Sequence, residues 1–166
     1  MAEYIADAAV SAFGGKFPNE LIVFLISMLP IVELRGGMFA AKLFEIDFFK
    51  AFLICYTGNM LPVPFILLFI RKIFGFLKKK KKFSALIKKL EDKTYLKSDK
   101  ALRWKGLGLL FFVAVPVPGT GGWTGSLIAA LLEMKIRISF PLIALGVFIA
   151  DLIMGGLLYG ILGSVV

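Results

Sequence analysis

The sequence contains no histidine and only one cysteine among its 166 residues. Without histidine, the chain lacks the commonest catalytic base and metal ligand of proteins. The single Cys55 excludes an internal disulfide and a cysteine-built zinc site, and because it stands in an apolar run we expect a buried, inert thiol. We therefore expect no metal and no other cofactor. An enzyme is the least favoured class, because only Glu33 and Asp151 offer acid–base chemistry inside the apolar segments.

Polar residues are also scarce, since 59% of the chain is hydrophobic and phenylalanine alone occurs 17 times. Soluble domains are about 45–50% apolar, and a chain of this length cannot bury the excess in one core. The composition predicts an integral membrane protein. The segment Met1–Val10 carries Glu3 and Asp7 and no basic residue, unlike a secretory signal, so we expect the hydrophobic segments to remain in the mature protein.

Basic residues are rare outside one stretch, Arg71–Lys105, where fourteen of them face three acidic residues. A nucleic-acid patch is one interpretation. Because membrane-grade sequence flanks the stretch on both sides, we favour a cytoplasmic loop that obeys the positive-inside rule and rests on anionic lipid headgroups, with no nucleic-acid partner. Four apolar residues in it follow helical spacing and predict a short interfacial helix: Phe83, Leu86, Ile87 and Leu90.

Two hydrophobic blocks flank this loop, and each contains one uninterrupted run. Phe48–Ile70 and Ile138–Leu162 both exceed the roughly 20 residues that a helix needs to cross the hydrocarbon layer. The runs Leu21–Phe44 and Leu107–Leu132 are long enough but are interrupted by proline and glycine. Proline cannot continue a regular helix, and irregular backbone survives in lipid only where protein or water surrounds it. We interpret both interrupted runs as re-entrant hairpins.

The two blocks resemble each other when one is shifted by 89 positions, which places Gly36 on Gly125 and Leu43 on Leu132. This predicts a single all-α membrane domain, an inverted repeat in which a hairpin precedes a full span in each half. Its parts are an N-terminal segment (1–20), a first repeat (21–70), the basic loop (71–105) and a second repeat (106–166). A plain four-helix bundle with two kinked helices is the alternative.

Glu33 and Arg35 lie well inside the first interrupted run, where charges are costly unless paired or hydrated. Residues i and i+2 of a regular helix do not face each other, so either the backbone is unwound or each side chain has its own partner. Unwinding agrees with Pro30 before them and Gly36 and Gly37 after them. We interpret Arg35 as an anion clamp, and Glu33 as its orienting partner or a proton carrier. A structural ion pair between hairpins is the alternative.

The second interrupted run contains Pro116 and Pro118, followed by a segment rich in glycine and threonine. Its backbone N–H groups and hydroxyls suit an anion, with help from the positive end of the following helix. The spacing is not that of a P-loop, and tight helix crossing is the alternative interpretation. The candidate headgroup-binding residues here are Gly119, Thr120, Gly121, Gly122, Trp123 and Thr124.

Each full span carries one polar residue near its middle, Asn59 in the first and Asp151 in the second. Asp151 is a candidate proton relay or a partner for Arg35, and Asn59 a supporting hydrogen-bonding residue. The last span also has a glycine face that suits packing on another helix or on a second copy in a homodimer: Gly155, Gly156, Gly160 and Gly163.

The two interrupted runs carry a family resemblance. Pro30-Ile-Val-Glu33-Leu-Arg35-Gly36-Gly37 resembles the P-x-x-E-L-R-G segment of the small multidrug export protein family. Pro116-Val-Pro118-Gly-Thr-Gly-Gly-Trp123-Thr124-Gly125 resembles that family's second motif, P-x-P-G-T-G-x-W-T-G. The family is similar to the wider DedA superfamily (SNARE-associated, VTT), which has two re-entrant hairpins in an inverted repeat.

The resemblance implies membrane transport in the prokaryotic cytoplasmic (inner) membrane, and some DedA-type proteins return undecaprenyl phosphate across it with proton coupling. By position, Glu33 and Arg35 match the acidic and basic residues of the first hairpin. The second DedA-type hairpin usually carries an arginine where this chain has Thr120 and Gly121. Our leading hypothesis is a proton-coupled transporter of an anionic lipid carrier. The alternatives are a proton-coupled exporter of cationic compounds and a non-transporting assembly scaffold.

Overall fold

The computed structural model describes residues 17–78, 99–117 and 119–161, together with Tyr4, Ala8 and Ser11. It is built of helices, which confirms the predicted all-α membrane fold. The first half consists of α2 (Asn19–Met28), α3 (Glu33–Leu43), α4 (Phe48–Met60) and α5 (Pro62–Lys78). The second half consists of α7 (Asp99–Ala114), α8 (Gly122–Leu131), α9 (Ile136–Gly155) and the π-helical η1 (Gly156–Ile161). The predicted interfacial helix over 83–90 lies outside the described residues.

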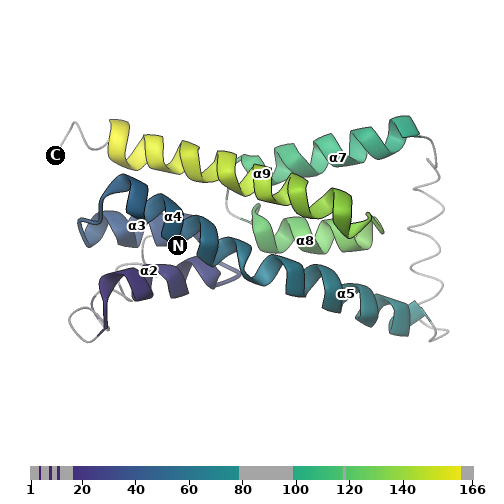
Figure 1. Ribbon diagram of the computed structural model, residues 1–166, viewed down its shortest axis with the longest axis horizontal. Coiled ribbons are helices and arrows are strands. Elements are labelled where there is room, and N and C mark those ends of the chain that lie inside the picture. Colours follow the sequence, from purple (N-terminus) through teal and green to yellow (C-terminus); the bar gives the residue numbers. More distant parts are fainter. Residues whose placement is uncertain are drawn as a thin grey trace.

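Two helices are long and apolar enough to cross a membrane, Phe48–Ile70 (α4 continued by α5) and Ile136–Gly160 (α9 continued by η1). They run in opposite directions along the long axis of the molecule (Figure 1). Beyond the first span, α5 runs on to Lys78, and α7 already begins at Asp99, so helix extends into both ends of the predicted basic loop.

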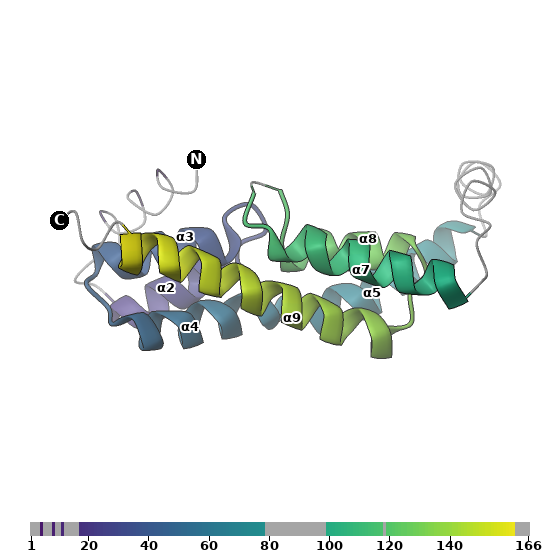
Figure 2. The same cartoon turned by 90° about the horizontal axis from the view of Figure 1, so that it is seen from above.

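The remaining helices form two hairpins, α2–α3 and α7–α8, that enter from opposite ends and meet near the middle of the long axis (Figures 1 and 2). α2 and α8 have 10 residues each and α3 has 11. At 1.5 Å per residue each is only about 15 Å long, half of the roughly 30 Å hydrocarbon layer. These helices can reach the middle of a bilayer but cannot cross it.

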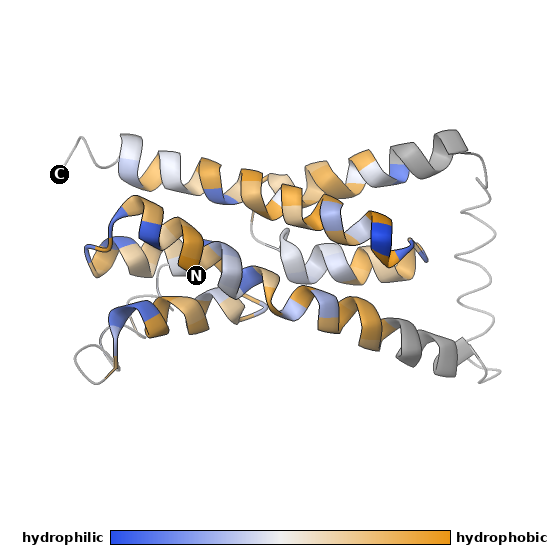
Figure 3. Ribbon diagram, viewed as in Figure 1, coloured by the Kyte–Doolittle hydropathy of each residue, from blue (hydrophilic) through white to orange (hydrophobic). Residues whose placement is uncertain are grey.

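Most of the length of the helices has hydrophobic colours in Figure 3, and hydrophilic colours mark the corners where each hairpin turns into its span, as well as a few positions near the middle of the molecule. Many large apolar side chains along the helices are exposed, whereas a soluble protein buries most of them in its core. Those more than half exposed in the two spans are Phe49, Leu53, Phe65, Leu68 and Phe69. Lipid tails are the natural cover for such a surface.

The corner turns of the two halves have the same geometry. Glu45 and Glu133 both adopt a left-handed conformation, with φ of 55° and 54°. The next amide donates back into the helix in both, from Ile46 N to Ala41 O at 2.9 Å and from Met134 N to Ala129 O at 3.0 Å. This is the hydrogen bond that closes a helix in a Schellman turn. Equivalent corner residues are 88 positions apart, not the 89 predicted from residue identity.

Glycines at the same spacing allow close packing inside each half. A methyl group on Gly37 of α3 would overlap Ser27 Oγ of α2 and lie 2.9 Å from Cys55 Sγ of α4. A methyl group on Gly125 of α8 would overlap Val113 of α7 and lie 3.7 Å from Ile143 of α9. Both glycines therefore let a hairpin's second helix approach its first helix and its span together. The contacts of Gly125 agree with tight helix crossing, the alternative interpretation of the second interrupted run.

A second glycine pair serves the other contact of each half. A methyl group on Gly58 would lie 2.8 Å from the carbonyl oxygen of Phe24 in α2, and one on Gly146 would lie 3.2 Å from that of Leu110 in α7. Each span thus contacts the backbone of a hairpin helix through a glycine. An unwound backbone around Glu33 and Arg35, one of the two options drawn from the sequence, is not found, because α3 begins at Glu33 and contains Arg35, Gly36 and Gly37.

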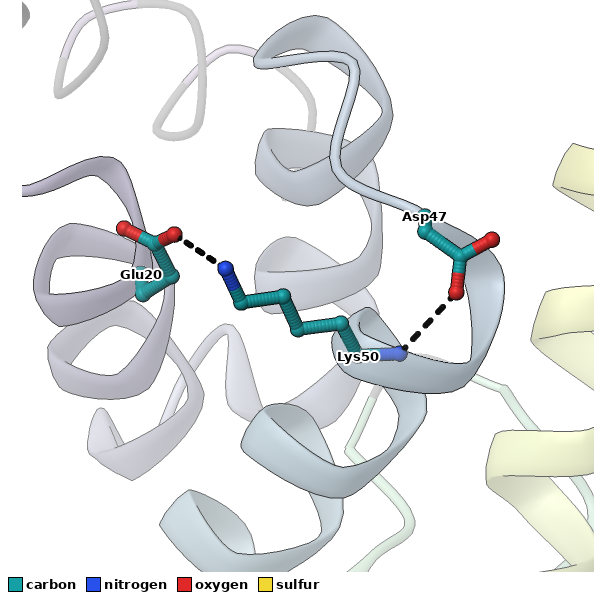
Figure 4. Close-up of polar contacts among 3 residues, drawn as sticks. All are labelled: Glu20, Asp47 and Lys50. Atoms are coloured by element: carbon teal, nitrogen blue, oxygen red, sulfur yellow. Dashed lines mark hydrogen bonds and ion pairs between the residues drawn. The ribbon is translucent and has the colours of Figure 1, made fainter.

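The outer corner of the first half is held by polar contacts (Figure 4). Asp47 caps α4 by accepting hydrogen bonds from Phe49 N at 2.9 Å and Lys50 N at 3.5 Å. The Lys50 side chain reaches Glu20 at the start of α2, with Nζ 2.6 Å from Oε1. The hydrogen bond and positive charge of Lys50 lower the pKa of Glu20 below its ordinary value.

Candidate functional site

The tips of the two hairpins meet at the centre of the molecule, and hydrogen bonds join them (Figure 2). The first tip is the turn between Met28 and Glu33, and the second is the turn between Ala114 and Gly122. Prolines explain both breaks, since Pro30 and Pro116 stand where no helix continues. Pro116 is half-buried, and Pro118 lies outside the described residues.

Glu33 and Arg35 stand at the start of α3 and point to different partners. Glu33 opens the helix with a φ of 51°, and its amide donates to Leu29 O at 2.9 Å. Its side chain is only 5% exposed, whereas Arg35 is half-buried. They do not form an ion pair, although their charges attract each other at longer range. Of the two options drawn from the sequence, separate partners is the correct one.

Arg35 donates hydrogen bonds to the second hairpin. Its Nη2 donates to the carbonyl oxygen of Thr120 and to Thr120 Oγ1 at 2.9 Å. Both acceptors are neutral, and no acidic side chain of the described ranges forms an ion pair with Arg35. The guanidinium charge at the centre of the molecule is therefore hydrogen-bonded without being neutralised by direct contact with a carboxylate.

Thr120 also holds its own turn in shape. Its Oγ1 lies 2.6 Å from Val115 O and 2.8 Å from Val117 O, and it accepts from Val117 N at 3.2 Å. Gly119 in this turn has a φ of 87°, a conformation that glycine adopts without steric cost. The turn thus presents one carbonyl and one hydroxyl to Arg35.

Glu33 places its carboxylate on the N-terminus of α8. Oε1 accepts a hydrogen bond from Trp123 N at 3.3 Å, and a methyl group on Gly121 would overlap the carboxylate. Gly121 precedes the helix and has no side chain to cap it. The carboxylate of the first hairpin therefore takes the place that a capping side chain would fill.

Trp123 joins the hairpins a third time. Its indole Nε1 donates to Met28 O at 3.0 Å, and so satisfies a carbonyl at the end of α2 that has no partner within its helix. Thr124, the next residue, is half-buried one turn into α8. No sequence pattern predicts the contact with Met28, because its acceptor is a backbone atom.

Asn59 and Asp151 are buried polar residues near the middle of the two spans; Ser139, near the start of the second span, is also buried but donates to Lys135 O at 3.3 Å. Asn59 and Asp151 have no exposed surface, and their four side-chain polar atoms find no hydrogen-bond partner. Asn59 Oδ1 lies 3.0 Å from where a methyl group on Gly122 would stand. Asp151 does not pair with Arg35, contrary to one expectation. Cys55 is buried, as predicted.

The glycine face of the last span divides in two. A methyl group on Gly155 would overlap the ring of Phe48, so this glycine serves packing within the chain. A methyl group added at Gly156 or Gly160 would meet no side chain or neighbouring helix within 4 Å, and Gly163 lies outside the described residues. Among the described residues, no cluster of three or more His, Cys, Asp or Glu side chains is arranged to bind a metal ion.

A family model with the description "Putative small multi-drug export protein" matches residues 33–153 of the chain. The match begins at Glu33 and extends past Asp151, so it also contains Arg35 and Asn59. It confirms the resemblance found from the two motifs. A search of the curated proteins and a search of the solved structures each gave no match.

Proposed function

The chain belongs to this family of small multi-drug export proteins, and from that premise we propose that it translocates an anionic lipid headgroup such as a polyprenyl phosphate. The family is a class of exporters and not of enzymes. The finer choice of substrate is ours, and it depends on the chemistry at the hairpin tips. The related proposals are a multi-pass location in the prokaryotic cytoplasmic membrane and a cytoplasmic basic loop, supported by the charge bias of 71–105.

One observation carries the proposal: Arg35 stands where the tips meet, and its partners are neutral oxygens of Thr120. Both contacts use Nη2, one of three guanidinium nitrogens. A guanidinium presents a fork of donors that matches phosphate, and the nearby N–H groups of α8 add donors and a positive helix end. A cationic substrate would meet repulsion at the same place.

Two buried carboxyl groups inside the apolar helices, those of Glu33 and Asp151, support proton coupling. Glu33 lies beside Arg35 at the tips, and Asp151 lies in the last span without a hydrogen-bond partner. Ionisable groups at this depth are costly and serve proton relays in many transporters. Either group can carry the proton in this proposal.

Reconstituted liposomes test the proposal. Translocation of polyprenyl phosphate should be measured with and without a pH gradient for the wild type, Arg35→Ala and Arg35→Lys. Loss of charge-assisted hydrogen bonds costs about 1.5–3 kcal/mol, so Arg35→Ala should lose at least about tenfold in flux, with partial recovery in Arg35→Lys. Arg137→Ala is the matched control, because Arg137 is exposed at the start of α9. Full flux in Arg35→Ala would overturn the anion clamp.

Proton-coupled export of cationic compounds is the second candidate. The family description favours it, and so does Asp151, a buried carboxyl group that no side chain of the described ranges neutralises. A cationic-dye efflux assay on the same liposomes separates the two. Dye flux that needs Asp151 and survives Arg35→Ala would replace the lipid-phosphate proposal with this one.

A further inference from the structure

The N-terminus of α8 is a built anion site that already holds an anion of the protein's own. Ten residues long, α8 presents backbone N–H groups that lack partners in their own helix. The Glu33 carboxylate accepts one of them, from Trp123, and rests on Gly121, where a side chain would displace it. Glu33 comes from the opposite hairpin, 90 residues earlier in the chain.

A buried polar side chain of α4 also lies at the first residue of α8, Gly122. Asn59 of α4 is fully buried, and neither its oxygen nor its nitrogen has a hydrogen-bond partner. Its Oδ1 approaches Gly122 to within 3.0 Å of the missing methyl position. An amide left unpaired in a protein interior costs free energy unless a ligand or water completes it. The same amide group carries Nδ2, a hydrogen-bond donor without a partner among the described residues, and an anion is an acceptor.

We propose that Glu33 is an internal substitute for the substrate's anionic group: when ionised it occupies the N-terminus of α8, and when protonated it yields that place to a phosphate group. The inference rests on the proposed function, because it takes the substrate to be an anionic headgroup. Each anion bound then requires uptake of one proton from water by the Glu33 carboxylate. Substrate and proton bind together at one site.

The physical reason is competition for the same donors. A phosphate group held by Arg35 and the first turn of α8 would stand against the Glu33 carboxylate, and two anions in a low-dielectric site repel strongly. Protonation removes that repulsion and weakens the attraction of the carboxyl group for the helix end. The order of events follows, since the proton opens the site and the anion fills it.

The charged surroundings of Glu33 are simple. Arg35 is the one charge on α3 that acts on it, and α8 and the described residues of the second tip carry no charged side chain. α2 contributes only Glu20, which is held at the far corner by Lys50 of α4. α9 contributes Asp151, whose carboxylate has no hydrogen-bond partner among the described residues, and Arg137, which is exposed at the start of the helix. Glu33→Gln keeps the shape of the side chain and changes only the charge at the end of α8.

Calorimetric titration of the detergent-purified protein tests this, with farnesyl phosphate and inorganic phosphate as separate probes between pH 5.5 and pH 8. Glu33→Gln should bind farnesyl phosphate at least about tenfold more tightly than the wild type at pH 8, with the ratio approaching one at pH 5.5. The ionisation of the probe is common to both proteins and cancels in the ratio. At pH 8 the wild type should take up one proton more per anion than Glu33→Gln, and this difference should disappear at pH 5.5. Glu45→Gln is the matched control, because Glu45 is exposed at the corner. Binding of inorganic phosphate alone would identify a free anion as the ligand.

A second measurement needs no ligand. In a Trp104→Phe background, Trp123 is the one tryptophan left, and its fluorescence should titrate with pH in the wild type and stay flat in Glu33→Gln. Equal affinities and equal proton uptake in wild type and Glu33→Gln would overturn the internal-anion proposal and leave the proposed function standing. A normal fluorescence titration with no binding of either probe would overturn the headgroup substrate, and the proposed function with it. Weaker binding by Glu33→Gln would overturn the competition.

Discussion

The first hairpin brings two charged side chains, Glu33 and Arg35, to the centre of the molecule, whereas the second brings backbone groups, a threonine hydroxyl and an indole. Around these tips the hairpins are built alike, with glycines and corner turns at equivalent positions. The comparison shows that the two hairpins share their glycine contacts and corner turns, whereas the charged side chains at the tips come from the first hairpin alone. Each charge finds its partner in the other half, so neither hairpin makes a site alone.

The two spans also differ in their polar residues. Positions 88 apart pair Asn59 with Val147, and Val63 with Asp151, and all four side chains are fully buried. A polar residue in one span thus corresponds to a valine in the other. Because a buried valine fills each equivalent position in the other span, packing does not require a polar residue there. We therefore expect Asn59 and Asp151 to have a role besides packing.

Breaking the shared scaffold should have the largest effect. Gly37→Ala and Gly125→Ala each place a methyl group on a neighbouring helix and should lower stability by about 2–3 kcal/mol. Gly156→Ala has open space and should be neutral or stabilising by up to about 1 kcal/mol. Thermal unfolding in detergent measures all three. Similar losses at Gly37 and Gly125 would support equivalent roles, and a loss at one alone would show that the halves pack differently.

Making the spans alike should separate stability from transport. Asn59→Val and Asp151→Val remove buried polar atoms that have no partner, so each should raise stability by about 1–2 kcal/mol. Both should impair flux in liposomes if these groups contact substrate or proton. The reverse changes, Val147→Asn and Val63→Asp, should destabilise. Loss of stability in Asn59→Val would instead assign that amide a structural role.

Much of the fold follows from the sequence because lipid makes strong demands on it. The first predicted span, Phe48–Ile70, agrees with the structure, and Pro30 and Pro116 mark both hairpin breaks. The glycines were harder. Gly36 and Gly37 read as helix breakers beside Pro30, yet inside a packed α3 they serve close approach of neighbouring helices.

The sequence singles out the polar residues that lie at the hairpin tips, but it does not predict which of them contact each other. Glu33, Arg35 and Thr120 stood out as polar groups or as part of a motif at membrane depth. Their partners depend on how the hairpin tips meet, and two of the acceptors, Thr120 O and Met28 O, are backbone atoms. A carboxylate that caps the helix of another hairpin has no local signature, because capping patterns in sequence describe neighbours along the chain.

The helix caps at the two corners offer a smaller change. Asp47 caps α4, while Lys135 stands at the equivalent place before α9 and makes no cap. Asp47→Ala should cost about 1 kcal/mol, and Lys135→Asp should add a similar amount by giving α9 the missing cap. Thermal unfolding of the two variants and their combination measures this. If the shift in melting temperature of the double variant differs from the sum of the two single shifts, the two corners are energetically coupled.

The ion pair at the first corner should have the smallest effect, since Lys50 and Glu20 are 59% and 41% exposed. Because Lys50 lowers the pKa of Glu20, the pair stabilises the fold above the ordinary carboxyl pKa and loses this effect as pH falls through the lowered value. Lys50→Met should therefore lower the melting temperature slightly at pH 7 and less at pH 3, and high salt should shrink the difference at pH 7. A loss that is equal at both pH values would show that Lys50 acts through the packing of its methylene groups and not through its charge. The ion pair would then contribute nothing to the stability of the first corner.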